Sequence, residues 1–233
     1  MIRYAKLDIK VDIDDLKIQT GKFINNSNWH PHFNTFYFDG EWEVLSLRSP
    51  GGATESIIPD LINNSVYSDT SLMAEFPSVQ LLLSKLECTI MSVRLLNLKS
   101  GAVIKPHRDP ELCLEMGEAR LHFPVFTNPL VEFFVDQDRV IMNEGDCWYI
   151  NANRFHRVAN QGASDRIHLV VDCQVNDWLK NLFERAEKVL TEENENDAEI
   201  IKIITELRLQ NTETSNKIAD SLAEKIRLNS SGD

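Results

Sequence analysis

The chain has 233 residues, of which 42% are hydrophobic and 8% aromatic; this suits one packed domain with a small appendage and is too apolar for a disordered protein. The formal net charge of −12 argues against nucleic-acid binding, because that function needs a basic surface and the lysines and arginines form no basic run. The four cysteines include no CxxC pair, so neither a zinc knuckle nor a disulfide framework is expected. No window approaches the length of a membrane span and the N-terminal residues lack an apolar signal core, so we expect a cytoplasmic protein without membrane contact.

The N-terminal eighty residues give a mixed pattern. Residues 25–35 are rich in Asn and His, and we expect them to be irregular, with His30 and His32 in a proline-linked surface loop. Residues 42–52 (WEVLSLRSPGG) predict a strand that ends in a Ser-Pro-Gly-Gly loop, and residues 79–87 predict a helix that covers the sheet.

Short β-rich segments separated by turns occupy residues 87–175, as in a sandwich or barrel. The predicted strands are residues 89–98, 102–105, 120–126, 131–135, 139–142, 147–150, 156–160 and 166–173. About eight short strands with frequent turns indicate a mainly β fold, namely a jelly roll or double-stranded β-helix with supporting helices.

The C-terminal region is predicted to be helical. It follows Asp177, which is a good N-cap residue, and apolar residues recur at helical spacing at positions 178, 182 and 186, then over 200–207 and 218–226. We therefore expect a double-stranded β-helix domain over residues 1–185, including the mixed N-terminal region, and a helical appendage over residues 186–233. The apolar stripes of the appendage favour packing on the domain or a homodimer through the C-terminal helices.

Three side chains in the β-rich part form a candidate metal site. His107 and Asp109 make an HxD pair, and His156 follows at the start of a later strand. Two imidazoles and one carboxylate can occupy one face of an Fe(II) octahedron and leave three positions for a chelating co-substrate and O₂. Arg166, ten residues after the second His, could bind the distal carboxylate of that co-substrate. This order is typical of Fe(II)- and 2-oxoglutarate-dependent oxygenases.

Strand alternation gives an independent indication. In residues 120–126, Arg120 and His122 share one face; in residues 166–173, Arg166, His168 and Asp172 share one face, opposite an apolar row. Two interpretations follow. The polar faces contact solvent and the apolar faces form the core, or the polar faces line a barrel that holds an anionic ligand.

Five stretches resemble the aspartyl/asparaginyl β-hydroxylase family, which includes bacterial proline 3-hydroxylase-type enzymes. They are LSLRSPGG (45–52), VRLLNLKSGAVIKPHRD (93–109), GEARLHFPVFTNPLVEF (117–133), GDCWYINANRFHRVANQG (145–162) and DRIHLVVDCQVNDWL (165–179). The resemblance covers most of residues 40–180 and implies the double-stranded β-helix fold.

At matching positions, the resemblance also implies functional roles. The iron ligands would be His107, Asp109 and His156, and Arg166 would bind 2-oxoglutarate. Arg120 and His122 fall on the strand that lines the co-substrate pocket in the family. Arg94 and Arg48 fall near the mouth of the site, where either could pair with a substrate carboxylate.

The expected activity is hydroxylation of an unactivated carbon in a small amino acid or aminoacyl group, with release of succinate and CO₂ from 2-oxoglutarate. The animal members of the family lack the metal-binding carboxylate, so Asp109 indicates the bacterial branch. Two other functions remain open at this point: a cupin-type metalloenzyme that does not use 2-oxoglutarate, and a ligand-sensing module without enzyme activity.

Overall fold

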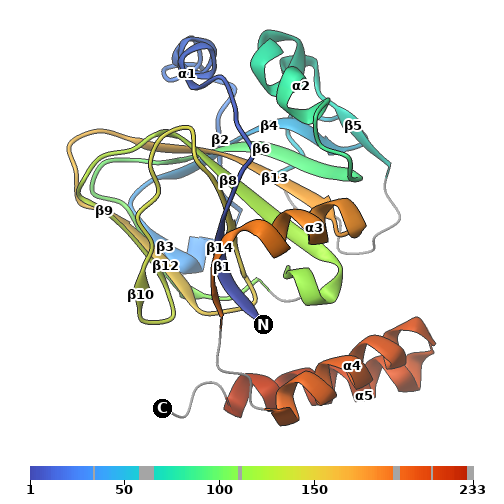
Figure 1. Ribbon diagram of the computed structural model, residues 1–233. Coiled ribbons are helices and arrows are strands. Elements are labelled where there is room, and N and C mark those ends of the chain that lie inside the picture. Colours follow the sequence, from blue (N-terminus) through green and yellow to red (C-terminus); the bar gives the residue numbers. More distant parts are fainter. Residues whose placement is uncertain (34, 58–65, 110–111, 191–194, 211, 230–233) are drawn as a thin grey trace. The chain divides into compact units, whose positions relative to one another are not determined.

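The computed structural model (Figure 1) describes residues 1–33, 35–57, 66–109, 112–190, 195–210 and 212–229. The chain divides into two compact units. One consists of residues 3–189, and the other of residues 1–2 with residues 190–233.

The larger unit contains two β-sheets, which confirm the predicted jelly roll. The 9-stranded sheet has the order β14-β1-β11-β8-β13-β6-β4-β2, with β5 paired to β4. Its strands are β1 (Ile2–Leu7), β2 (His30–Pro31), β4 (Trp42–Pro50), β5 (Tyr67–Asp69), β6 (Ile90–Leu98), β8 (Glu118–Phe126), β11 (Cys147–Ile150), β13 (Arg166–Gln174) and β14 (Glu187–Leu190). The 5-stranded sheet has the order β10-β9-β12-β7-β3. Its strands are β3 (Phe38–Asp39), β7 (Val103–His107), β9 (Val131–Val135), β10 (Asp138–Arg139) and β12 (His156–Asn160).

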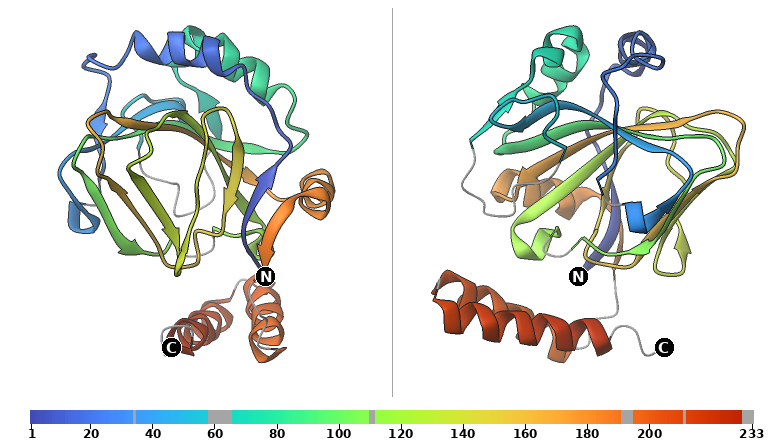
Figure 2. Two further views of the ribbon diagram at one scale, coloured as in Figure 1. Left: turned by 60° about the vertical axis from the view of Figure 1, so that its left-hand side comes forward. Right: turned by 180° about the vertical axis from the view of Figure 1, so that it is seen from behind.

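Helices cover the outer face of the large sheet, where α1 and α2 lie side by side (Figures 1 and 2). The α-helices of this unit are α1 (Ile13–Gly21), α2 (Pro77–Leu83) and α3 (Asp177–Arg185), and the 3₁₀ helices are η1 (Thr35–Tyr37), η2 (Ser71–Glu75) and η3 (Leu114–Met116). The N-terminal strand β1 and helix α1 were not predicted from the sequence.

Two predicted helix boundaries were wrong. Helix α2 starts earlier than expected because Pro77 has the fixed φ that suits the first turn of a helix, and the chain leaves the helix at Ser84. The N-cap of α3 is Asn176, whose side chain accepts from the backbone N–H of Leu179; Asp177 is the next residue, inside the helix.

Both faces of the large sheet are buried, so the interpretation of the polar face as a solvent-facing surface was wrong. On the outer face, Tyr149 is register partner of Leu121 and makes an edge contact with Phe183 of α3, with ring centroids 4.8 Å apart. On the inner face, His122 lies 6.1 Å from the ring of Phe133, which belongs to β9 of the small sheet. The polar residues of β8 and β13 therefore point into the space between the two sheets, while their apolar neighbours pack under the helices.

Apolar residues from both sheets pack together and fill one part of the space between the sheets. This core contains Trp42, Val44, Leu96, Leu98, Ala102, Ile104, Phe133, Val135, Val140, Met142, Ile150, Val158 and Val170. The inner face of β13 is thus apolar at Val170 and polar at its flanking inward positions, His168 and Asp172, which are 2% and 6% exposed.

The C-terminal unit contains helices α4 (Glu195–Leu209) and α5 (Glu213–Asn229), which pack against each other. Ile204 and Ala219 are buried in this hairpin, and Ser215 Oγ accepts from the backbone N–H of Thr212 between the helices. No described helix is long and apolar enough to cross a membrane.

Candidate active site

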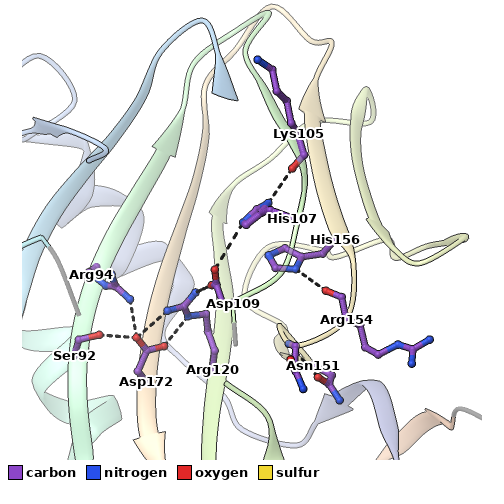
Figure 3. Close-up of polar contacts among 11 residues, drawn as sticks. Ser92, Arg94, Lys105, His107, Asp109, Arg120, Asn151, Arg154, His156 and Asp172 are labelled. Carbon is purple, nitrogen blue, oxygen red and sulfur yellow. Dashed lines mark hydrogen bonds and ion pairs between the residues drawn. The ribbon is translucent and has the colours of Figure 1, made fainter. Parts of the chain in front are cut away.

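The three residues of the predicted metal site lie side by side at the end of the β7–β12 pair (Figure 3). His107 ends β7, His156 begins β12, and the two are register partners with ring centroids 4.2 Å apart. Asp109 follows β7, and its backbone N–H donates to the carbonyl of Ala152 at 2.8 Å. One potential ligand atom of each residue lies within 4.8 Å of the others, so the cluster can hold a metal ion.

Backbone carbonyls orient both imidazole rings. Nδ1 of His107 lies 2.8 Å from the carbonyl oxygen of Lys105, and Nδ1 of His156 lies 3.0 Å from that of Arg154. Because a carbonyl oxygen only accepts, each Nδ1 carries a proton and Nε2 is the nitrogen that can face a metal ion. Burial lowers the pKa of His156 to about 4, so this ring is neutral at pH 7. Two imidazole nitrogens and one carboxylate fit a divalent transition metal with open positions.

The carboxylate of Asp109 is held by Arg120. Nη1 of Arg120 donates to Oδ2 of Asp109 at 2.6 Å, and Oδ1 of Asp109 lies 3.9 Å from Nε2 of His107. Burial raises the pKa of Asp109, but the positive charge of Arg120 and the neighbouring histidines outweigh this effect, so the pKa lies below its usual value. One oxygen of an ionised carboxylate thus contacts Arg120 and the other faces the cluster.

A second carboxylate, Asp172, connects two buried arginines. It accepts from Nη2 of Arg94 at 2.6 Å, from Nε and Nη2 of Arg120 at 2.7 and 3.1 Å, and from Oγ of Ser92 at 2.7 Å. Burial alone raises the pKa of Asp172, yet the two guanidinium groups bring it well below its usual range. A continuous series of ion pairs therefore runs from Arg94 through Asp172 and Arg120 to Asp109 (Figure 3).

Arg166 is also buried, but unlike Arg94 and Arg120 it has no described carboxylate within ion-pair distance. It is 3% exposed, and its Nη2 donates to Nδ1 of His168 at 2.9 Å. Its buried Nε finds no acceptor in the described part of the chain. Burial lowers the pKa of Arg166 to about 9, so the group stays charged at neutral pH. A buried, uncompensated guanidinium is costly unless an anionic ligand completes the site.

His122 lines the same interior as Arg166. Its ring lies 5.9 Å from that of His168, and its buried Nδ1 has no hydrogen-bond partner among the described residues. Burial, reinforced by the charge of Arg166, lowers the pKa of His122 and of His168 well below the usual value. Both rings are therefore neutral hydrogen-bonding groups beside the positive charge of Arg166.

Arg48, the other predicted contact at the mouth, is held elsewhere. Its Nη1 lies 2.6 Å from Oδ1 of Asp69, and its Nη2 donates to the carbonyl of Tyr67 at 2.9 Å, where β4 pairs with β5. Within the described residues, no ion pair or hydrogen bond joins Arg48 to the His107 cluster.

Sequence reasoning missed two aromatic neighbours of the site. The ring of Tyr37 stacks on His107 at 5.4 Å, and His32 stacks on Trp42 at 3.6 Å. The His32 side chain is half-buried against Trp42 and not in the surface loop that we expected, and burial lowers its pKa to about 3, with Arg94 contributing. The signal that could have found it is its aromatic surroundings in the segment Trp29–Phe33, which are unusual for an exposed loop.

The profile of the aspartyl/asparaginyl β-hydroxylase family matches residues 8–175. The chain belongs to this family. L-proline cis-4-hydroxylase of Rhizobium meliloti (strain 1021) is 26% identical to it over 167 residues, which are 68% of this chain and 58% of that protein. L-proline cis-3-hydroxylase 1 of Streptomyces sp is 28% identical over 141 residues, which are 58% of this chain and 48% of that protein. The chain thus spans about half the length of these curated relatives.

Among solved structures, an oxidoreductase of the 2OG-Fe(II) oxygenase family from Burkholderia pseudomallei aligns with 70% of this chain and 77% of its own, with a TM-score of 0.47 and 11% identity. This likeness is distant, and the jelly-roll assignment of this family member rests on its own strand topology.

Proposed function

We propose that this member of the aspartyl/asparaginyl β-hydroxylase family is an Fe(II)- and 2-oxoglutarate-dependent hydroxylase. It uses O₂, releases succinate and CO₂, and acts on an unactivated carbon of a small amino acid or aminoacyl group. The observation that carries the proposal is the pairing, in one interior, of a His107–Asp109–His156 cluster with the buried, unpaired Arg166. The family match and the two proline hydroxylases among its relatives support the same reaction class.

In this proposal, His107, Asp109 and His156 hold the ferrous ion. The backbone carbonyls that receive the two Nδ1–H groups fix the orientation of both rings, so little ordering remains when the ion binds. When bound, Fe(II) supplies the redox chemistry by which O₂ and 2-oxoglutarate oxidise a C–H bond.

Arg166 binds the distal carboxylate of 2-oxoglutarate. Its guanidinium is protonated, buried and fixed by His168, so a carboxylate would gain a charge-assisted hydrogen bond in a dry site. The neutral His122 adds a hydrogen-bonding group on the same wall. Arg120 adds positive charge beside Asp109, and its contacts with Asp109 and Asp172 favour a role in holding the site together.

The charges of the interior favour a substrate that carries a carboxylate. Three guanidinium groups (Arg94, Arg120 and Arg166) and two carboxylates (Asp109 and Asp172) leave one positive charge when the buried histidines are neutral. The charges of a ferrous ion and a 2-oxoglutarate dianion cancel, so this single positive charge persists in the loaded site. A substrate carboxylate beside one of these guanidinium groups would compensate this charge locally.

Arg94 is the favoured partner for that carboxylate. It is 5% exposed, belongs to the ion-pair series that ends at Asp109, and has a buried Nε without an acceptor among the described residues. The guanidinium of Arg48 already binds Asp69 and the Tyr67 carbonyl. A substrate contact by Arg48 therefore stays a prediction.

The test is a mass-spectrometric screen of amino acids for the gain of one oxygen, with Fe(II), ascorbate and 2-oxoglutarate present. We expect succinate in a one-to-one ratio with hydroxylated product, and a visible charge-transfer band when Fe(II) and 2-oxoglutarate are added without O₂. His107→Ala and Asp109→Ala should abolish turnover, whereas His30→Ala, which removes a histidine outside the cluster, should not. Turnover without consumption of 2-oxoglutarate would refute the proposal.

A companion variant tests the co-substrate pocket. Arg166→Ala should raise the concentration of 2-oxoglutarate that gives half-maximal turnover by about 100-fold, because it removes a buried charge-assisted contact. An unchanged requirement would show that the distal carboxylate binds elsewhere.

A further inference from the structure

Asp172 lies outside the proposed metal-ligand set, yet it receives more hydrogen bonds than any ligand of that set. Four N–H or O–H groups from Ser92, Arg94 and Arg120 donate to its two oxygens at 2.6 to 3.1 Å. Its neighbours come from two strands on either side: Arg120 is its register partner on β8, and Ser92 and Arg94 belong to β6.

The strand register brings Ser92 to this position. β13 pairs with β6 at Val170↔Arg94 and Val171↔Val93, and the same register places Ser92 opposite Asp172 before it shifts ahead of Cys173. Residues two apart in a strand share a face, so Ser92 lies with Arg94 on the inner face. The contacts of Asp172 are thus built into the strand geometry.

Asp109, by contrast, lies outside the strands. It follows the end of β7, where its backbone N–H donates to the carbonyl of Ala152 at 2.8 Å and its carbonyl accepts from the N–H of Leu112 at 3.4 Å. Its side chain is bound by Nη1 of Arg120, while Nε and Nη2 of the same guanidinium bind Asp172. Because a guanidinium is planar and rigid, the two contacts with Asp172 determine the plane in which Nη1 points at Asp109.

We propose that Asp172 is a positioning residue of the metal site: by clamping the guanidinium plane of Arg120, it presents Oδ1 of Asp109 to the ion that His107 and His156 bind. This inference rests on the proposed function. A purely structural role for Asp172, as the counter-ion of buried arginines, would affect stability but would leave metal affinity unchanged in a folded variant.

Metal affinity separates the two roles without reference to turnover. Co(II) is the probe, because its visible absorption reports both binding and ligand geometry. We expect Asp172→Asn to weaken Co(II) binding by 10- to 100-fold and to alter the absorption band, as is usual when a group that orients a metal ligand is lost. Arg120→Lys keeps the charge but not the planar fork, so it should weaken binding to a similar degree, and it also serves if Asp172→Asn does not fold.

A matched control is available on the same strand pair. Asp165 accepts from Lys99 and Asn97 and makes no described contact with the cluster, so Asp165→Asn should bind Co(II) like the unmodified chain. If folded Asp172→Asn or Arg120→Lys binds Co(II) with an affinity within twofold of that of the unmodified chain, the positioning role of Asp172 is overturned and the proposed metal site is not. Failure of the unmodified chain to bind Co(II) would overturn the proposed metal site, and the role of Asp172 with it.

Discussion

Two buried arginines in the jelly-roll interior, Arg120 and Arg166, differ in what neutralises them. Arg120 contacts Asp172 and Asp109 at 2.6 to 3.1 Å, and these carboxylates raise its pKa above the ordinary value despite burial. Arg166 contacts only a neutral imidazole by hydrogen bond, and burial lowers its pKa to about 9. The protein thus completes one site with its own residues and leaves the other to be completed by a ligand, at a cost in stability.

Substitution at the two sites should change the free energy of unfolding unequally, and this difference is the largest effect that we expect. Asp172→Ala leaves the buried Arg94 without a described carboxylate and removes one of the two that Arg120 contacts, so it should lower the free energy of unfolding by roughly 3–5 kcal/mol. Arg166→Met removes an uncompensated buried charge and should leave the free energy of unfolding of the ligand-free chain unchanged or raise it. Urea denaturation of both variants is the measurement, and equal losses in the two would invalidate the comparison.

Acid should destabilise the metal-free chain through the neutral histidines beside Arg166 and in the metal cluster. The unfolded chain takes up these protons near pH 6.5, whereas folded His156 does so only near pH 4, and burial also lowers the pKa of His122 and of His168 well below 6.5. The unfolded state therefore binds more protons below pH 6.5, and stability is lost as the pH falls toward 4. His156 alone accounts for about 3 kcal/mol. Denaturation at pH 7.5 and 4.5 measures the loss, which should be smaller in His122→Gln; a flat profile would contradict the burial of these rings.

A ligand should remove the difference between the two arginines. With Co(II) present, 2-oxoglutarate at 100 times its dissociation constant should stabilise the chain by about 2.7 kcal/mol. In Arg166→Met most of this stabilisation should disappear at the same ligand concentration, and thermal unfolding with and without 2-oxoglutarate tests it. Equal stabilisation of both proteins would argue that Arg166 does not contact the ligand.

The smallest effect is expected at an ion pair outside the interior. Asp165 and Lys99 lie 3.0 Å apart, and their side chains are 28% and 25% exposed. Such a solvated pair contributes at most about 1 kcal/mol, so Asp165→Asn should change the free energy of unfolding far less than Asp172→Ala. A loss as large as that of the Asp172 variant would show that exposure does not explain the contrast.

Much of the fold was predictable from short-range patterns. Alternation and turn residues predicted β6, β8, β9, β11, β12 and β13 within a few residues of their observed bounds. The β1 strand was not predicted, because its pairing with β11, where Ala5 lies opposite Tyr149, depends on a partner far along the chain. The α3 boundary was missed by one residue, because Asn176 and Asp177 are both good N-caps and their backbone conformations decide between them.

The site was predictable to a different extent. The sequence by itself determined which functional groups are available. Motif spacing identified His107, Asp109 and His156 as candidate metal ligands and Arg166 as a candidate carboxylate-binding residue, and the strand period put Arg166 and Asp172 on one face. Only the tertiary structure decided that this face is buried between two sheets, that Asp172 pairs with Arg94 and Arg120, and that Arg166 has no described carboxylate beside it. The physical reason is that an ion pair depends on distances across strands that are neighbours in space and distant in sequence, and strand periodicity contains no information on those distances.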